Sequence, residues 1–369
     1  MNDDNPRVAL SISSRSEAAA PDLPTARGVQ VALDDLPNRK GRSAQIAVDL
    51  FDDEGDPERT AELAEEIVRD RRYVAVIGPM GSDEAFANAP IFNREGLLQI
   101  SPCASHPDLC QRGFKTFFRL VPNERQQGQE LARIATRFFR AGKIVTVADA
   151  DAFGRSVSAI FREGCAALGS EVVAEAFFGR GTTDFDDVLS EVIAHDPDVV
   201  FFAVHQHEGK MVSSRLRALG VRAPFLGTDG MKTSFFLGGG DEHGDAFHTH
   251  SGADFRRLPS AAAFRDKYTA RFPEDSTYSP EAYDALMLIA DAFDRATEPT
   301  RAGVLEAFRS RRTYEGVTGE IAFDDSGERV GSPVSFYRVT TRDGERQMEY
   351  LGTTGEVIHA PATAVGKSL

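Results

Sequence analysis

Two short stretches of the chain combine serine hydroxyls with small residues in a way that suits anion binding. Residues 76–82 read Val-Ile-Gly-Pro-Met-Gly-Ser, and residues 99–105 read Gln-Ile-Ser-Pro-Cys-Ala-Ser. Each is a short apolar run that ends in small residues and a serine, as expected for a buried parallel strand running into a loop with backbone N–H groups. Ligands of open α/β sheets bind at the carboxyl ends of the strands. The two loops therefore predict a site for a small anion, most simply a carboxylate.

Strand-like and helix-like segments alternate along most of the chain. The clearest helix, Pro57–Arg69, has Asp56 as its predicted N-cap and an apolar stripe along one face. The first run of predicted strands is Val8–Ile12, Ile46–Phe51, Tyr73–Ile77, Leu97–Ile100 and Phe117–Val121. A second run is Ile144–Ala148, Val172–Phe178, Val199–Val204 and Pro224–Gly227. Because repeated β–α alternation gives a parallel sheet with helices on both faces, we predict an α/β protein with two doubly wound, Rossmann-like lobes.

The part of the chain after about residue 260 is mostly helical in pattern, with Pro259–Phe272 and Pro280–Thr297 as its main elements. Two late predicted strands, Glu320–Phe323 and Val334–Val339, are too few to form a third sheet. We therefore expect them to complete the two existing sheets, so that the chain crosses between the lobes more than once.

Length and composition restrict the class of protein. With 369 residues, 41% hydrophobic and 27% charged, the chain is expected to be a soluble protein with two cores. A net charge of −15 argues against nucleic acid and anionic membranes as partners, because both attract clustered cations. No stretch approaches the roughly twenty apolar residues of a transmembrane helix. The acidic start, Met1–Pro6, lacks the pattern of a secretory signal, so either the protein is cytosolic or a leader or upstream domain is missing.

The cysteines and histidines give neither a disulfide framework nor a metal-binding pattern. Cys165 lies on the apolar face of a predicted helix and is expected in the core. Cys103 and Cys110 flank a tight loop, and they either pair in an oxidising compartment or stay free. Residues 205–208, His-Gln-His-Glu, favour a polar rim over a metal pair. Three further histidines are expected as solvated side chains of a glycine-rich loop: His243, His248 and His250.

The ordered succession of motifs resembles the type I periplasmic binding proteins, specifically the branched-chain amino-acid (Leu/Ile/Val) group that serves ABC importers. The resemblance runs from about Val8 to Leu351. The motifs that carry it are Asp52–Pro57, Val76–Ser82, Ile100–Leu109, Phe118-Arg119, Gln127-Gly128, Phe153-Gly154, Asp184-Phe185, Phe225–Gly230 and Ala282–Ala285. The family implies two lobes, joined by three hinge strands, that close on a ligand without a chemical step. Neither enzyme activity nor a cofactor is therefore expected.

The resemblance also implies where the chain crosses between the lobes. The crossings are expected near Val121–Pro122, Ser251–Ala253 and Asp324–Ser332. The first lobe would then contain residues 6–121 and 252–325, and the second lobe residues 122–251 and 326–353. Residues 354–369, rich in small and polar types, would form a loose C-terminal tail.

Ligand-binding roles follow from the same resemblance. Ser82 and Ser105 match the hydroxyl ligands of the substrate α-carboxylate, and the backbone N–H groups of Cys103 and Ser105 would complete the cradle. Asp229 matches the acidic residue that pairs with the ligand ammonium. The other matches to pocket positions are Phe153, His205 and Tyr278. Purely structural readings stay open: Ser82 as a helix cap, Asp229 as a turn residue and the aromatic residues as packing.

The leading functional prediction is an extracytoplasmic solute-binding protein that captures an amino acid or a similar small polar molecule for an ABC importer. Its partners would be the permease and, as another option, a second copy of itself. It would be periplasmic or lipid-anchored if a leader was removed, and cytoplasmic if Met1 is the true start. Because Asp83 and Glu84 place negative charge beside Ser82, the ligand could also be more cationic than leucine, or not an amino acid. The alternative is a ligand-sensing regulator or a sensory domain of the same fold.

A third class, an enzyme with nucleotide-binding lobes, lacks its motifs in this sequence. We find no Gly-x-Gly-x-x-Gly after a first strand, no Walker-type loop and no Gly-x-Ser-x-Gly elbow. The three consecutive glycines at 238–240 open no periodic helix and are expected to form a loop.

Overall fold

The structure, a computed structural model, describes residues 5–13, 24–179, 181–204, 206–231, 246–272, 278–342 and 345–359. The chain divides into two compact units. Unit 1 contains Met1–Pro122 and Asp254–Ser332, and unit 2 contains Asn123–Ala253 and Pro333–Leu369. The chain thus passes from one unit to the other three times. Residues 326–332, which the sequence analysis assigned to the second lobe, belong to unit 1.

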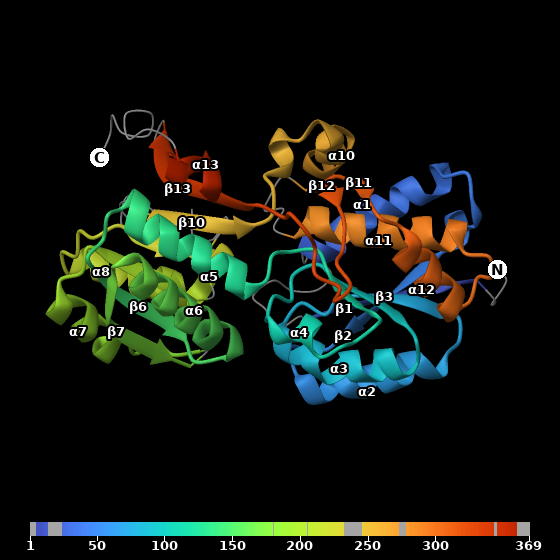
Figure 1. Cartoon of the computed structure of the whole chain (residues 1–369), viewed down its shortest axis with the longest axis horizontal. Coiled ribbons are helices and arrows are strands. Elements are labelled where there is room, and N and C mark those ends of the chain that lie inside the picture. The colour runs from blue at the N-terminus through green and yellow to red at the C-terminus, as the bar shows by residue number, and fades with distance from the viewer. Residues whose placement is uncertain are drawn as a thin grey trace. The chain divides into compact units, whose positions relative to one another are not determined.

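A five-stranded parallel sheet forms the centre of unit 1 (Figure 1). Its strands, in spatial order, are β2 (Ala47–Asp52), β1 (Arg7–Ile12), β3 (Tyr73–Ile77), β4 (Leu98–Ser101) and β5 (Phe117–Arg119). All neighbouring strands pair in parallel. The five strands therefore end at one edge of the sheet, called here the carboxyl edge, and begin at the opposite, amino edge.

Helices cover both faces of this sheet. Two of them, packed side by side, bury their apolar stripes against one face: α2 (Pro57–Arg69) and α3 (Ser82–Arg94). Three cover the other face: α1 (Pro24–Asp35), α11 (Ser279–Arg295) and α12 (Arg301–Ser310). Smaller elements of the unit are α4 (Asp108–Gln111), α10 (Ala262–Arg271) and a hairpin of β11 (Tyr314–Gly316) and β12 (Gly319–Ile321).

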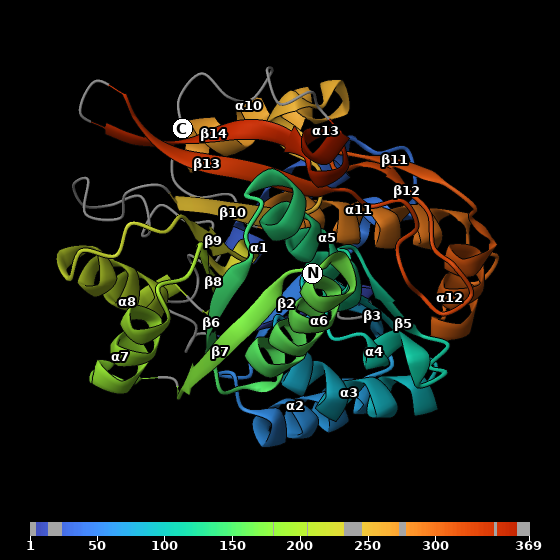
Figure 2. The ribbon, with the colours of Figure 1, turned by 60° about the vertical axis from the view of Figure 1, so that its left-hand side comes forward.

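Unit 2 is built around a seven-stranded mixed sheet (Figure 2). Its strands, in spatial order, are β14 (Glu345–Thr353), β13 (Val334–Arg342), β10 (Ala246–Ser251), β9 (Phe225–Gly227), β8 (Val199–Ala203), β6 (Lys143–Asp149) and β7 (Glu171–Phe178). The strands from β6 to β10 pair in parallel, whereas β13 runs antiparallel to β10 and to β14. One face carries α5 (Glu124–Arg133), α6 (Ala152–Leu168) and α13 (Thr354–His359), and the other α7 (Asp186–His195) and α8 (Gln206–Ala218).

The predicted fold class is confirmed, and some elements have the predicted bounds. Helix α2 and strand β3 begin and end at the residues that the sequence patterns indicate. The carboxylate of Asp56 caps α2, because it accepts hydrogen bonds from the N–H groups of Glu58 and Arg59 at 2.8 and 3.2 Å. Buried apolar residues of α2 then face the sheet, as the predicted stripe requires.

Three predictions about the later part of the chain are wrong. Strand β12 pairs with β11 in a separate hairpin and completes neither main sheet. His248 and His250 do not lie in a solvated loop but on the buried strand β10, where the His248 ring stacks on Tyr337 at 5.4 Å. Residues 354–359 form helix α13 instead of loose chain, because Val357 packs into the core of unit 2. His243 lies outside the described residues.

Candidate functional site

Two neighbouring loops at the carboxyl edge of unit 1 carry the predicted serines. The first follows β3 and leads into α3, and the second follows β4. The Oγ atom of Ser82 accepts a hydrogen bond from the backbone N–H of His106 at 3.1 Å, which joins the two loops. Gly81, not Ser82, is the N-cap residue of α3. Because a hydroxyl that accepts a bond still has its own proton to donate, Ser82 suits a carboxylate ligand.

Ser101, which the sequence analysis did not single out, holds the second loop in shape. Its buried hydroxyl donates to the Pro79 carbonyl at 3.0 Å. The same oxygen accepts from the N–H groups of Ala104 at 2.9 Å and Cys103 at 3.4 Å. The Cys103 N–H proposed for the cradle thus already has a long intraloop bond. A serine hydroxyl that accepts from the backbone N–H groups two and three residues later is typical of such a local turn, so the serine itself is the sequence signal.

Cys103 and Ser105 are both buried in the second loop, with 8% and 7% of their surfaces exposed. The Cys103 thiol contacts the Met80 carbonyl oxygen at 2.9 Å and so adds a third link between the loops. All three cysteines are free, so Cys103 and Cys110 form no disulfide, and Cys165 is fully buried in unit 2 as predicted.

The His106 side chain is neutral in this setting. Its ring lies edge-on to Phe86, with the ring centres 5.0 Å apart, and its Nδ1 atom accepts from the Asp108 N–H at 3.2 Å. Burial is the main cause that lowers the pKa of His106, against the opposite influence of Asp108. The surroundings of His106 therefore favour the uncharged form of its imidazole.

A buried carboxyl group lies at the same edge, directly after β2. Asp53 is fully buried and accepts from the Ser11 hydroxyl and the Gly55 N–H, both at 2.9 Å. Burial raises the pKa of Asp53 to about 6, and the negative charges of Glu84 and Asp52 add to the rise. The carboxyl edge thus combines hydrogen-bonding loops with acidic neighbours.

Unit 2 holds the predicted acidic ligand residue. Asp229 follows β9 and begins a short 3₁₀ helix, Asp229–Met231. The side chain is buried, and its Oδ2 atom accepts from the hydroxyl of Ser251 at 2.7 Å. Ser251 is the last residue of β10, so a neighbouring strand end positions the carboxylate.

The remaining predicted residues have mixed outcomes. Phe153 is half-buried near the start of α6 and packs against the apolar core of unit 2, in line with its packing reading. Tyr278 immediately precedes α11 with a left-handed backbone, φ 60°, which is uncommon for an aromatic residue. His205 lies outside the described residues.

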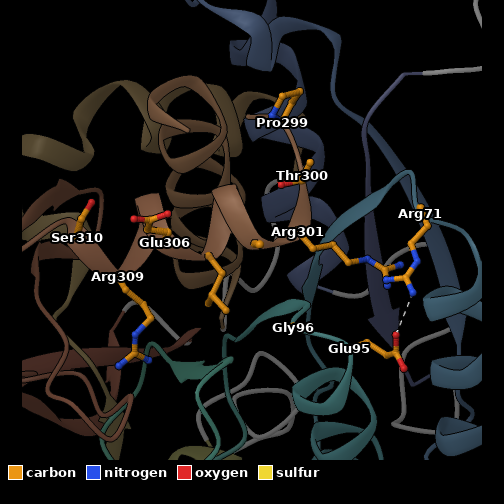
Figure 3. A pocket seen from close by; sticks show the side chains of 11 residues that line it. Arg71, Glu95, Gly96, Pro299, Thr300, Arg301, Glu306, Arg309 and Ser310 are labelled. Atoms are coloured by element: carbon orange, nitrogen blue, oxygen red, sulfur yellow. Dashed lines mark hydrogen bonds and ion pairs between the residues drawn. The ribbon is translucent and has the colours of Figure 1, made fainter. Parts of the chain in front are cut away.

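A hollow of about 870 Å³ lies at the opposite, amino edge of unit 1 (Figure 3). Its lining includes Arg71, Glu95, Thr300, Arg301, Glu306 and Arg309. Its cations already have partners, since Arg301 donates to four backbone carbonyls and Arg71 contacts Glu95 at 3.3 Å. Because ligands of parallel sheets bind at the carboxyl ends of strands, we assign the candidate site to the loops of Ser82 and Ser105 and not to this hollow.

In the described ranges, no group of three or more His, Cys, Asp or Glu side chains could hold a metal ion. In the same ranges, no helix combines the length and the apolar character needed to cross a membrane.

Similar sequences include amino-acid-binding proteins of bacteria. A family model described as periplasmic binding protein matches residues 6–345. A Leu/Ile/Val-binding protein of Rhizobium johnstonii is 25% identical over 316 residues, which cover 84% of this chain and 85% of that protein. A leucine-, isoleucine-, valine-, threonine- and alanine-binding protein of Pseudomonas aeruginosa is 24% identical over 303 residues, covering 82% and 81%.

Solved structures share the fold at lower identity. The branched-chain amino acid transporter substrate binding protein LivJ from Streptococcus pneumoniae, in complex with isoleucine, has a TM-score of 0.82 and 23% identity, covering 94% of this chain and 99% of that one. A solute binding protein of an ABC transporter from Rhodopseudomonas palustris, in complex with 3,4-dihydroxybenzoic acid, has a TM-score of 0.84 and 19% identity, covering 95% and 97%.

Proposed function

The chain belongs to the periplasmic binding protein family, and from this premise we propose that it captures a small carboxylate, in the first place an α-amino acid, for an ABC importer. Binding itself is the function, because a ligand stabilises the conformation that binds it more tightly and no chemical step is needed. The hydrogen bond from the His106 N–H to the Ser82 hydroxyl supports the proposal most directly. It joins the two serine-containing loops at the edge of the sheet where proteins of this architecture bind ligands.

The ligands of the similar structures agree with a carboxylate as the common feature. Isoleucine and 3,4-dihydroxybenzoic acid both have a carboxyl group, whereas only isoleucine has an ammonium group. Asp229 is the residue proposed to distinguish them, as a buried carboxylate fixed by Ser251. A buried charge without a counter-charge is expensive, so this residue would select against ligands that lack an ammonium group. We therefore rank α-amino acids above aromatic acids.

Thermal-shift and calorimetric binding measurements with L-isoleucine and 3,4-dihydroxybenzoate test this ranking. We expect L-isoleucine to raise the melting temperature of the wild-type protein. Asp229→Asn should weaken L-isoleucine binding about 100-fold, equal to about 3 kcal/mol, because the ammonium loses its counter-charge. If only the aromatic acid binds, the role given to Asp229 is wrong. If Ser105→Ala leaves the affinity of the ligand that binds unchanged, the cradle is wrong.

The location and partner belong to the same proposal. The family acts outside the cytoplasm, and we propose this location and an ABC permease as partner for this chain. Fractionation of its host, followed by mass spectrometry of the mature N-terminus, distinguishes a free periplasmic form from a lipid-anchored one. Recovery of the full-length chain from the cytosol would instead support the sensing alternative.

A further inference from the structure

We propose that Arg119 and Glu328 form a buried pair that positions the Ser105 loop for ligand binding. The inference rests on the proposed function, since it takes Ser105 as a ligand contact. Arg119 ends β5, and its side chain is completely buried, while 14% of the Glu328 side chain is exposed. The guanidinium donates to the two carboxylate oxygens of Glu328 at 2.8 and 2.6 Å. Such two-point contacts fix direction as well as distance.

The other N–H donors of Arg119 bind the Ser105 loop, the segment that follows β4, directly. They reach the carbonyl oxygens of Ala104 at 3.3 Å, His106 at 2.9 Å and Pro107 at 3.4 Å. A guanidinium has five N–H donors, so these three bonds and the two to Glu328 use all of them. Lysine, with three donors on one atom, could not reproduce this arrangement.

The hydrogen bonds from Arg119 to these carbonyls also orient the backbone of Ser105. In a trans peptide the C=O and N–H groups point in opposite directions. Since the Ala104 carbonyl points at the guanidinium, the N–H of Ser105 points away from it. Arg119 thereby sets the direction of one of the two N–H groups that the family resemblance implies for the carboxylate cradle, without contacting the ligand itself.

Glu328 is held in place by the turn that carries it. Its N–H donates to the Asp324 carboxylate at 3.0 Å, and its carbonyl accepts from the Asp324 N–H at 3.0 Å. Gly327 in this turn has a φ of +94° and accepts from the Arg119 N–H at 3.1 Å. A Cβ at Gly327 would lie 2.2 Å from the Phe117 carbonyl oxygen, so only glycine permits this approach. Glu328 therefore reaches Arg119 from a fixed backbone.

A second arginine makes the reverse connection between the same two segments. Arg329 donates to the carbonyl of Leu120 at 3.0 Å and to that of Thr318 at 2.9 Å. The segment at the end of β5 and the turn of residues 324–329 thus each contribute one buried arginine that donates hydrogen bonds to the other. Both segments lie shortly before points where the chain passes into unit 2. The loop that contains Ser105 is therefore connected to both segments that lead from unit 1 into unit 2.

Loss of the Glu328 charge should weaken binding through the loop. A buried guanidinium without its carboxylate is strongly unfavourable and draws in water or shifts position. The Ser105 loop then spends less time in the binding geometry, and the apparent Kd rises by the inverse of the fraction that remains competent. If that fraction falls to about one tenth, affinity falls about tenfold.

The test is a double-mutant cycle on the Kd for L-isoleucine, measured by calorimetry on the wild type, Glu328→Gln, Ser105→Ala and the double variant. We expect Glu328→Gln to weaken binding about tenfold alone and about threefold or less in the Ser105→Ala background. In that background the hydroxyl that the pair positions is absent, and only the backbone N–H at position 105 still depends on the pair. A merely structural role for Glu328 predicts the same factor in both backgrounds. 3,4-Dihydroxybenzoate is the second probe, since it shares the carboxylate.

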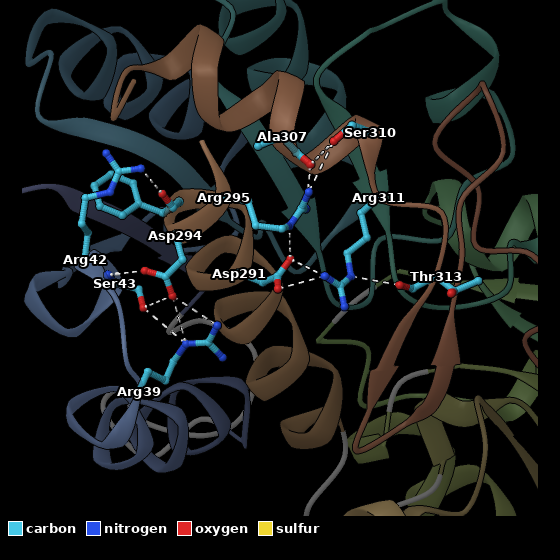
Figure 4. Close-up of polar contacts among 11 residues, drawn as sticks. Arg39, Arg42, Ser43, Asp291, Asp294, Arg295, Ala307, Ser310, Arg311 and Thr313 are labelled. Atoms are coloured by element: carbon cyan, nitrogen blue, oxygen red, sulfur yellow. Dashed lines mark hydrogen bonds and ion pairs between the residues drawn. The ribbon is translucent and has the colours of Figure 1, made fainter. Parts of the chain in front are cut away.

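Asp294→Asn is the matched control. Asp294 is similarly buried, with 17% of its side chain exposed, and pairs with Arg39 at 3.3 Å (Figure 4). It also accepts from the hydroxyl and the N–H of Ser43, just before β2 and thus near the amino edge. We expect this variant to lower the melting temperature while its Kd stays within about twofold of the wild type.

The outcomes separate the two proposals. If the wild type binds and Glu328→Gln changes the Kd no more than Asp294→Asn does, the positioning role is overturned and the proposed function stands. If the wild type binds neither probe, both proposals fall. Should Glu328→Gln not fold, Arg119→Lys replaces it in the same cycle with the same expectation.

Discussion

The two edges of the unit 1 sheet each contain a buried arginine, and the two arginines have different roles. At the amino edge, Arg301 donates only to backbone carbonyls, including Tyr73 at the start of β3 and Val68 in the last turn of α2. At the carboxyl edge, Arg119 divides its donors between Glu328 and a loop. Arg301 joins the end of a helix to the start of a strand, whereas Arg119 fixes the conformation of a loop.

This difference separates stability from binding within one sheet. A cation at the end of α2 interacts favourably with the helix dipole and satisfies carbonyls that have no partner within the helix. Arg301 therefore contributes to folding without affecting the ligand loops. The Arg119 network stabilises one loop conformation, so its contribution should be visible in affinity. If this is correct, substitutions at one edge should change stability or affinity without changing the other.

The largest expected effect is at the amino edge. Arg301→Ala should lower the free energy of unfolding by about 3 kcal/mol, because it leaves buried carbonyls without a donor. Arg301→Lys should recover part of the loss, since its ammonium can reach some of these carbonyls. Urea unfolding measures the stability, and calorimetry with L-isoleucine measures the Kd. A loss of affinity in step with stability would show that the two edges are not independent.

An intermediate effect is expected from Asp53 at the carboxyl edge, and it depends on pH. Burial raises the pKa of Asp53 from 3.8 to about 6, so between these values the folded protein holds a proton that the unfolded chain has released. Stability from this group is therefore present at low pH and is lost as pH rises through about 6. The free energy of unfolding of the wild type should decrease by about 2 kcal/mol between pH 4 and pH 6.5 because of this group, and Asp53→Asn should not show that decrease. Urea unfolding at several pH values should show the difference in free energy of unfolding between the two proteins changing by about 2 kcal/mol across that range. A constant difference would contradict the prediction.

The smallest effect is expected at the amino-edge hollow. Arg71 is 72% exposed and pairs with Glu95 at 3.3 Å. Exposed ion pairs of this kind contribute little, so Arg71→Ala should change the free energy of unfolding by less than about 0.5 kcal/mol. It should also leave the Kd for L-isoleucine unchanged. A marked loss of affinity would move the ligand site to the edge that we have excluded.

Local sequence signals predicted the elements whose cause is local. Helix α2 has a strong N-cap and an uninterrupted apolar stripe, and β3 is a short run of apolar residues, so both have the predicted bounds. Strand β10 was missed because His248, Thr249 and His250 look like solvated loop residues, although all three are buried. Their burial depends on pairing with β9 and β13, which local patterns do not reveal.

The candidate site shows the same limit. Motif order led to Ser82 at the start of α3, Ser105 in the loop after β4 and Asp229 at the start of a 3₁₀ helix. The Arg119–Glu328 pair could not be predicted in this way, because 209 residues separate its members and many other charged residues could have been partners. A long-range pair of this kind becomes visible only when the backbone of β5 and the turn of residues 324–328 are placed together.

The buried thiols have a practical consequence. The chain has three cysteines, all buried, and burial raises the pKa of the Cys110 and Cys165 thiols to about 12. Since the thiolate is the reactive form, these side chains should react slowly with maleimide dyes at neutral pH. A cysteine introduced at Leu219, which is 57% exposed, would then be the main labelling position. A dye could thus be attached at one chosen surface position without first removing the native cysteines.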